Sequence, residues 1–421
     1  MKTPCSVSNR VPDLKQNASM DQTCQEHSHS RDGLNVLDQL QSADFYGAVA
    51  KILEFRTIYI EEKRIFIKGE ALIPVLQGLG ARQDDFEHMK LVSDHLGKDP
   101  TVDYRNIGLG RFALDPAKRE VVRLEDQLFA LTVEENYKRH DSGVARDFSP
   151  VGCEFQHNTV VQALMVFKSI MMQGFPLDER QGLDYTSDSW VCNLFNVRTF
   201  TEKDIQGHPA LEGVHQDGGD HTMTVFLHSE NLRRDSAVTL VHDNNEITGI
   251  SGYESNPRFI MDRFQHRHYL DTLMFADNSY KHSVTPLYSF REEDSAVRDM
   301  LVLITRKPKL PGHPSKIPDS MEPNRRLPLR FPLPGLNDKD SLTEICHSIL
   351  CAAETVGVPM IKGPGIGFSV TRIFESSVMT KQWVDPYLRI SVGVDPDHVQ
   401  RVADAVLEGM RKHCLITEEK V

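Results

Sequence analysis

Two histidines and one aspartate in the second half of the chain have the types and spacing to bind a metal ion. His215 and Asp217 lie two residues apart in the glycine-containing segment Glu212–Gly219. Alternate residues of a β-strand point to the same face, so both side chains can reach one ion. Glycine also lets the backbone approach a metal closely. His282 begins a later β-type run and is the third candidate ligand.

Two imidazoles and one carboxylate are typical of mononuclear iron(II) oxygenases. This set leaves three positions of the ion open, two for a bidentate 2-oxo acid and one for dioxygen. The centre keeps a net positive charge, which favours an anionic co-substrate. The sequence therefore predicts an Fe(II) site at His215, Asp217 and His282, with a 2-oxo acid and O2 as co-substrates.

Several other histidines are alternatives for the third ligand. His266 and His268 flank Arg267, and these polar surroundings predict a solvated loop. His282 instead stands at the junction of a turn and a strand, where the rim of a barrel is expected. Surface or strand positions are predicted for the remaining histidines of this region, His221, His228 and His242.

Arg298 is the candidate residue for binding a 2-oxo diacid as co-substrate. It opens the β-type run after His282, and its guanidinium could hold the far carboxylate of the co-substrate through two parallel hydrogen bonds. Thr285 is the candidate hydroxyl partner. The alternative is a surface arginine that pairs with Asp299 or Glu293.

The elements that must position these residues are mainly short strands. Between Trp190 and Thr305 short β-type runs alternate with polar turns. From Leu34 to about Leu96 the pattern is mostly helical, with a strand-like run at 57–60, and another helix is predicted over 158–173. The predicted fold class is α+β: a double-stranded β-helix (jelly roll or cupin) core with flanking helices, residues 34–306, and a small C-terminal α/β domain.

The two ends of the chain differ from this core. Residues 1–33 are polar and lack an apolar signal segment, which predicts a disordered tail. Eight prolines between positions 308 and 334 predict a linker over 307–339. Residues 340–421 predict the small α/β domain: helices over 342–356 and 398–412, a glycine-rich loop at 363–367, and strands at 369–374 and 387–392.

Composition limits the partners. The 48 Lys and Arg against 60 Asp and Glu give a net charge of −12, which argues against nucleic acid or an anionic membrane as the main partner. The longest apolar run, 163–172, is too short to cross a bilayer. Seven scattered cysteines without a CxxC motif favour a reducing, cytoplasmic location. The oligomeric state, with a homodimer as one option, leaves no readable trace.

The run from Tyr104 to Thr305 resembles the bacterial and fungal 2-oxoglutarate/iron dioxygenases that hydroxylate free amino acids, typified by L-isoleucine dioxygenase. The resemblance rests on Tyr104-Arg105, Gly110-Arg-Phe112, Val197-Arg198, Glu212-Gly-Val-His-Gln-Asp-Gly218, His282-Ser-Val-Thr-Pro286 and Arg298-Asp-Met-Leu-Val-Leu303. It implies iron ligands at His215, Asp217 and His282, and 2-oxoglutarate at Arg298. Arg233-Arg-Asp-Ser236 departs from the Gly-Gly-Glu-Ser-like turn of relatives, which puts the substrate in doubt more than the reaction.

The C-terminal unit has a resemblance of its own. Tyr387–Gly393, followed by an amphipathic helix, is similar to the small domain of fold-type-I pyridoxal-phosphate enzymes, which implies a carboxylate-binding role for Arg389. The remainder of such an enzyme is not present, and Lys281, which imitates its Schiff-base lysine, lies inside the iron motif.

The combination of both parts most resembles the fungal enzymes of secondary metabolism that cyclise L-valine to a dimethylaziridine carboxylic acid. The loop at 363–367 would then cover the barrel mouth, with Ile366 and Phe368 as apolar walls for an aliphatic side chain. An ordinary glycine turn with two core residues is the alternative. Arg198, Arg105 and Arg389 are equal candidates for binding the amino acid carboxylate.

Three functions stay open at this point. The first is oxidation of a free aliphatic L-amino acid, by cyclisation or by side-chain hydroxylation of the isoleucine, leucine or valine type. The second is a pyridoxal-phosphate enzyme fragment. The third is a non-catalytic, cupin-like protein that binds a small acid.

Overall fold

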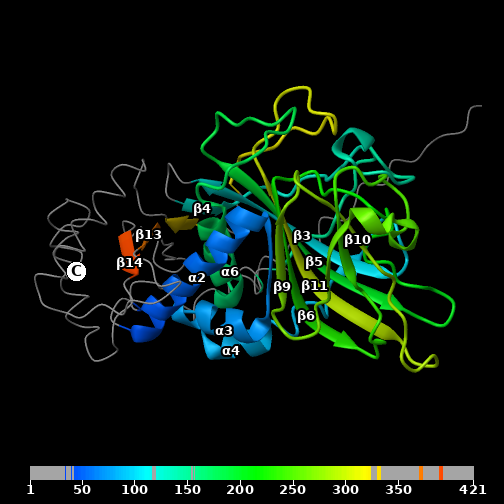
Figure 1. Cartoon of the computed structure of the whole chain (residues 1–421), viewed down its shortest axis with the longest axis horizontal. Helices are drawn as coiled ribbons and strands as arrows, with labels where there is room; N and C mark the ends of the chain where they lie inside the picture. The colour runs from blue at the N-terminus through cyan, green and yellow to red at the C-terminus, as the bar shows by residue number, and fades with distance from the viewer. Residues whose placement is uncertain are drawn as a thin grey trace, which may run out of the picture.

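A computed structural model describes residues 34, 39, 42–115, 120–152, 155, 157–323, 330–332, 369–372 and 388–391. Its centre is a large antiparallel sheet with the strand order β1-β9-β6-β11-β5-β3-β4-β12, and β2 pairs with β3 (Figure 1). The strands are β1 (Arg64–Ile67), β2 (Gly97–Lys98), β3 (Arg105–Asp115), β4 (Glu120–Arg123), β5 (Trp190–Thr201), β6 (His221–Glu230), β9 (Thr272–Ala276), β11 (Ala296–Arg306) and β12 (Arg330–Pro332).

A second sheet of three strands faces the first. Its order is β10-β7-β8, and it contains β7 (Thr239–His242), β8 (Ile260–Phe264) and β10 (Lys281–Val284). All pairings between the named strands of both sheets are antiparallel. Two facing antiparallel sheets are the arrangement of a jelly roll, so the predicted fold class is confirmed.

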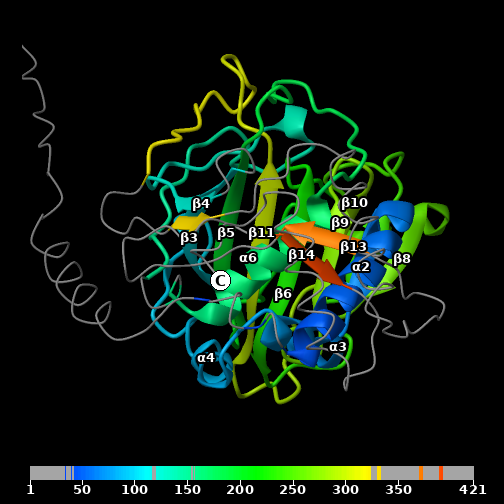
Figure 2. The same cartoon turned by 90° about the vertical axis from the view of Figure 1, so that its left-hand side faces the viewer.

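Four described helices lie together on the outer face of the large sheet (Figures 1 and 2). They are α2 (Ala43–Glu62), α3 (Gly69–Gly78), α4 (Gln83–His88) and α6 (Thr159–Met172). The predicted helix over 158–173 is confirmed as α6, which begins where the side chain of Asn158 accepts a hydrogen bond from the amide of Val160. Lys168 of α6 is buried and donates to the backbone carbonyls of His221 and Leu303, which ties the helix to the sheet.

The strand predicted at 57–60 is wrong, because these residues belong to α2. Ile52, Phe55 and Tyr59 recur at helical spacing and are buried in the core between the helices and the sheet. The hydroxyl of Tyr59 also lies 2.7 Å from Nδ1 of His221. Tertiary packing of this helix face therefore outweighs the local strand preference of the β-branched and aromatic residues.

Alternation along the strands separates the two faces of the large sheet. Leu194 of β5 and Leu301 and Leu303 of β11 pack in the helix-covered core. Their neighbours Phe195 and Val302 point the other way, into the space between the two sheets. The inner face of the sheet is therefore available to line a site.

Part of the predicted linker lies against the sheet. The side chain of Asp319 is only 4% exposed and pairs with Arg306 at the end of β11 and with Arg111 of β3. Further on, Arg330–Pro332 forms β12 beside β4. These contacts anchor residues 307–323 and 330–332 to the jelly roll.

The chain forms strands at both places predicted for the C-terminal unit. β13 (Ser369–Arg372) and β14 (Leu388–Ser391) pair antiparallel, next to α2 (Figure 1). The predicted tail at 1–33 lies outside the described residues. Both predicted C-terminal helices and the loop at 363–367 also lie outside them. Among the described residues, no helix is both long and apolar enough to cross a membrane.

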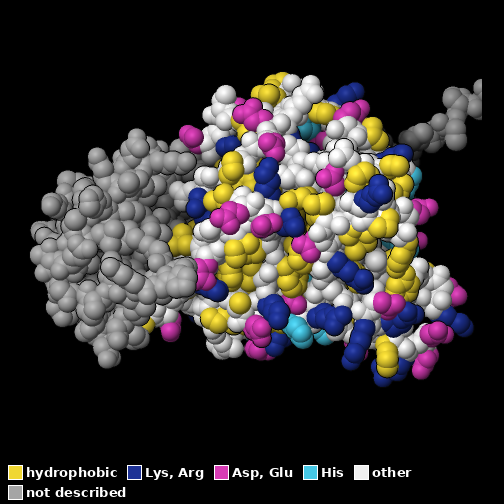
Figure 3. All heavy atoms as spheres, in the orientation of Figure 1, with side chains coloured by type: hydrophobic (Ala, Val, Ile, Leu, Met, Phe, Trp, Pro, Cys, Tyr) yellow, Lys and Arg dark blue, Asp and Glu magenta, His cyan; other side chains and the backbone are white. Residues whose placement is uncertain are grey.

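The face of the molecule shown in Figure 3 mixes acidic and basic side chains with scattered apolar ones. The described residues on that face form no continuous basic patch.

Candidate metal centre

His215 and His282 are brought together by backbone hydrogen bonds between two segments far apart in the sequence. The amide of each residue donates to the carbonyl of the other, both at 2.9 Å, in an isolated antiparallel bridge. Directly opposed residues of an antiparallel pair place their side chains close together. The two imidazole rings accordingly have centroids 4.1 Å apart.

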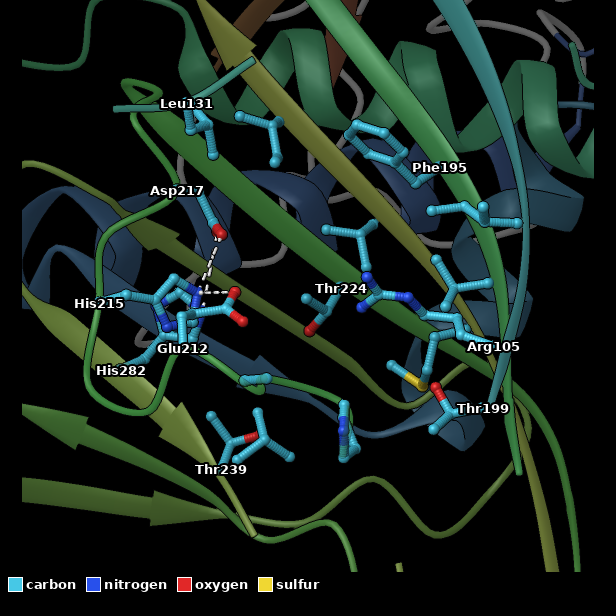
Figure 4. Close-up of a pocket in the computed structure, with 18 of the residues that line it drawn as sticks. Arg105, Leu131, Phe195, Thr199, Glu212, His215, Asp217, Thr224, Thr239 and His282 are labelled. Atoms are coloured by element: carbon cyan, nitrogen blue, oxygen red, sulfur yellow. Dashed lines mark ion pairs between the residues drawn. The ribbon is translucent and has the colours of Figure 1, made fainter. Parts of the chain in front are cut away.

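Asp217 completes the cluster from the same segment as His215. Its Oδ1 lies 3.4 Å from Nε2 of His215, and its Oδ2 lies 3.8 Å from Nε2 of His282. One candidate ligand atom from each residue lies within 4.8 Å of the others, and all three residues are buried. Figure 4 shows the three side chains converging at one end of a cavity. The structure thus brings together all three predicted ligands.

Neighbouring groups hold this arrangement in place. Nδ1 of His215 lies 2.9 Å from the carbonyl of Gly213, so it carries the proton and leaves Nε2 for a metal. Thr222 donates to Oδ2 of Asp217 at 2.7 Å. The backbone amide of Asp217 donates to Asp277, a buried carboxylate that also pairs with Arg180.

Charges around the imidazoles favour a cation at this point. Burial lowers the pKa of His215, but the carboxylates of Glu212 and Asp217 outweigh it and raise this pKa to about 9. Burial and the charge of His215 lower the pKa of His282 to about 3. Without a metal, the imidazole of His215 therefore carries an additional proton, which is stabilised by the carboxylates of Glu212 and Asp217. A divalent ion would occupy the same electrostatic position.

The donor set fits Fe(II). Two neutral imidazoles and one carboxylate on one side of an ion leave open positions that face the cavity, as an oxygenase requires. His215, Asp217 and His282 would be the protein ligands.

The cavity beside the cluster runs between the two sheets and has an empty volume of about 1030 Å³, including its open mouth. Apolar side chains of both sheets and of the preceding loops form most of its walls. Its polar and charged lining includes Arg105, Tyr137, Arg139, Arg146, Glu212, His266 and Arg298.

Arg298 lies in this cavity as predicted. It is buried, and its Nε has no hydrogen-bond partner among the described residues. Burial lowers the pKa of Arg298 to about 10, so the guanidinium stays charged at neutral pH. In the sheet register it stands opposite Thr199, which stands opposite Arg105, and all three residues line the cavity. An unpaired buried cation of this kind is suited to a carboxylate.

His266 occupies a different place from the predicted solvated loop. It is buried in the cavity wall, with Nε2 3.1 Å from the hydroxyl of Thr224. Burial and the charge of Arg298 lower the pKa of His266 to about 3, so it is neutral. The polar residues around His266 in the sequence predicted exposure to solvent, whereas in the structure His266 contacts Thr224 of β6.

Two predicted site residues do not line the cavity. The hydroxyl of Thr285 accepts from the amide of Val238 and donates to the carbonyl of Asp235, so it is not a partner of Arg298. Arg198 forms two hydrogen bonds of 2.8 Å with Asp299, on the opposite face of the sheet from the cavity-lining Thr199. Asp299 is therefore the partner of Arg198, and the alternative of an Arg298–Asp299 pair is wrong.

The other predicted substrate residues fall in three places. Arg105 lines the cavity and pairs with Asp99 through a 2.7 Å bond from its Nε. The backbone of Arg389 lies in β14, but its side chain is outside the described part of the chain. Ile366 and Phe368 also lie outside the described residues.

Sequence reasoning missed four polar residues of the cavity, namely Tyr137, Arg139, Arg146 and Glu212. Glu212 is part of the segment that contains the metal ligands, so its position three residues before His215 was an available signal. Tyr137, Arg139 and Arg146 lie in irregular structure between β4 and α6, where no periodic pattern indicates which side chains turn inward.

Comparison with known proteins adds to this geometry. The family model described as 2OG-Fe dioxygenase matches residues 90–304, slightly more than half of the chain. The chain belongs to this dioxygenase family. Enzymes of the family use Fe(II), 2-oxoglutarate and O2, so the predicted cofactor and co-substrates are confirmed at the level of the family.

Two individual proteins are similar to this dioxygenase. The bifunctional enzyme flvA of Aspergillus flavus is 52% identical over 300 residues, which are 71% of this chain but only 36% of flvA. The chain thus spans about a third of that relative. The solved structure of the Fe(II)/(alpha)ketoglutarate-dependent dioxygenase TqaL is 41% identical, with a TM-score of 0.61 over 70% of this chain and 98% of TqaL.

Replacing Thr222 with valine tests the support of the metal ligands in this dioxygenase. The change keeps the side-chain shape but removes the hydrogen bond to Asp217. We expect the affinity for Fe(II) to fall by about 10- to 100-fold, the usual effect of losing such a supporting contact. Anaerobic titration with Fe(II) measures it. Thr224→Val, two residues along the same strand, is the matched control and should bind Fe(II) normally.

Proposed function

We propose that the protein oxidises a free aliphatic L-amino acid and that His215, Asp217 and His282 bind its Fe(II). The observation that carries the metal assignment is this buried cluster at the end of a cavity that also contains the unpaired guanidinium of Arg298. Arg298 would hold the far carboxylate of 2-oxoglutarate. When bound, the iron and its co-substrates supply the oxidising power that breaks a substrate C–H bond.

The cavity walls support a small substrate with an aliphatic side chain. Phe129, Phe195, Val197, Met300 and Val302 form a continuous apolar surface on the inner face of the large sheet and the adjoining loop. A carboxylate and several arginines lie beside this surface. An apolar pocket with a few charged groups at one side suits an amino acid with a hydrocarbon side chain.

The proposed reaction is the oxidative cyclisation of L-valine to an aziridine carboxylic acid in secondary metabolism. The substrate loses one hydrogen from nitrogen and one from carbon, and a C–N bond forms. 2-Oxoglutarate and O2 become succinate, CO2 and water, which accounts for both hydrogens. Side-chain hydroxylation is the alternative, in which one oxygen atom of O2 enters the amino acid and the other enters succinate.

Product analysis tests this proposal. The protein is incubated with the twenty amino acids, Fe(II), 2-oxoglutarate, ascorbate and air, and the products are analysed by mass spectrometry. We expect an aliphatic amino acid that has lost two hydrogens, by cyclisation or desaturation, together with an equal amount of succinate. Gain of one oxygen would indicate hydroxylation instead. Binding of 2-oxoglutarate without any succinate would contradict the proposal and identify a non-catalytic small-acid binder.

A further inference from the structure

Glu212 is a charged residue of the cavity for which the metal and 2-oxoglutarate provide no role. Its side chain is 12% exposed, and its Oε1 lies 3.3 Å from Nε2 of His215. Its Oε2 is buried and has no hydrogen-bond partner among the described residues. Figure 4 shows the carboxylate of Glu212 beside the rings of His215 and His282, at the edge of the open cavity.

Metal binding would remove the contact between Glu212 and a proton on Nε2 of His215. Nδ1 of His215 is engaged with the carbonyl of Gly213, so the metal takes Nε2, which then carries no proton. Oε1 of Glu212 thereby loses its donor, and Oε2 already lacks one. A buried carboxylate without a donor or cation is strongly unfavourable. A cationic group with N–H donors next to Glu212 would supply the missing partner.

The charges of the other groups do not supply this cation. The iron and Arg298 carry three positive charges, and Asp217 with 2-oxoglutarate carries three negative ones. Glu212 then leaves one negative charge unmatched. Arg139 is turned toward Asp141, to which it donates two hydrogen bonds of 2.6 Å, and within the described part of the chain it forms no hydrogen bond or ion pair with Glu212. A cationic group of a ligand would match this charge directly beside Glu212.

A positive charge for the opposite end of the ligand is available nearby. Arg139 and Arg146 share the single carboxylate of Asp141, with N···O distances of 2.6 and 3.9 Å. Nε of Arg146 is buried and has no hydrogen-bond partner in the described part of the chain, although its guanidinium lies over the surrounding aromatic rings. The two arginines and one aspartate have an excess of one positive charge on the cavity wall.

We propose that Glu212 binds the ammonium group of an α-amino acid substrate next to the metal centre, while the Arg139–Arg146 pair attracts its α-carboxylate. This inference rests on the proposed function and specifies which groups recognise the zwitterion. Glu212 then keeps the substrate nitrogen on the metal side of the cavity, and the aliphatic side chain faces the apolar wall.

Ligand binding without turnover tests the role of Glu212. Under anaerobic conditions the protein is loaded with Fe(II) and 2-oxoglutarate, and its visible charge-transfer band is followed during titration with L-valine or with 3-methylbutanoate, which lacks the amine. We expect wild-type protein to bind L-valine about 10- to 100-fold more tightly than 3-methylbutanoate, as for a charge-assisted hydrogen bond. Glu212→Gln should lose this preference and keep the original band.

Control variants and contrary results separate this inference from the proposed function. Glu230→Gln makes the same change at the exposed end of β6 and should retain the preference. Equal affinity of the wild-type protein for both ligands, or no response to either, overturns the role of Glu212. Loss of the Fe(II)–2-oxoglutarate band in Glu212→Gln also overturns it, because Glu212 would then serve the metal. Absence of the band in the wild-type protein contradicts the metal site itself.

Discussion

Replacing His282 with alanine is expected to abolish Fe(II) binding and reduce succinate formation to background. The imidazole supplies one of the three protein donors in the described cluster, and the backbone bridge to His215 places it beside the other two. Loss of a supporting residue already weakens a metal site by about 10- to 100-fold, so removal of a ligand should exceed that. The visible charge-transfer band of the anaerobic Fe(II)–2-oxoglutarate complex measures the effect.

His228→Ala is the matched control for this experiment. His228 stands in His228-Ser-Glu230, which imitates the pattern of the metal ligands, but it is exposed near the far end of β6. We expect His228→Ala to retain the band and the activity. A band of normal intensity in His282→Ala would show that this residue is not a ligand, and circular dichroism of both variants would confirm that they are folded.

Replacing Arg298 with glutamine is expected to weaken 2-oxoglutarate binding by about 10- to 100-fold. The change removes a charge-assisted contact of about 1.5–3 kcal/mol to the far carboxylate. Fe(II) binding should be unchanged, because in the described structure Arg298 forms no hydrogen bond or ion pair with His215, Asp217 or His282. The KM for 2-oxoglutarate and its anaerobic dissociation constant both report the effect.

The stability of the Arg298→Gln variant distinguishes a ligand-binding role from a structural one. An unpaired buried guanidinium is unfavourable for folding, so its removal should leave the thermal midpoint unchanged or raise it. Arg198→Gln is the matched control: it breaks the ion pair with Asp299 without facing the cavity, so the 2-oxoglutarate affinity should stay normal. Equal 2-oxoglutarate affinity of wild-type protein and Arg298→Gln would contradict the assignment.

Strand alternation determines which of the two arginines, Arg198 or Arg298, faces the cavity. Both arginines were candidates from the sequence, and they lie on the adjacent strands β5 and β11. Arg298 is directly opposite Thr199 and shares its face, whereas Arg198 is opposite Asp299 and shares the other face. The register between two strands about a hundred residues apart in the chain thus separates the ligand-facing arginine from the ion-paired one.

Similar reasons explain the errors at Thr285 and His266. Thr285 follows the predicted metal strand closely, but its hydroxyl is taken by backbone groups of the segment before β7. His266 has polar neighbours in the sequence and is nonetheless buried against Thr224. In both cases the deciding contact comes from a segment that is distant in the chain.

The sequence by itself determined the types of the metal ligands, their two-residue spacing at His215 and Asp217, and the succession of short β-type runs that predicted a jelly roll. These are local properties, because a strand repeats every two residues wherever it lies. Only the tertiary structure decided that His282 lies opposite His215, 67 residues earlier, and that Glu212 faces the same cavity. Such contacts depend on how the two sheets pair and pack, which local sequence does not encode.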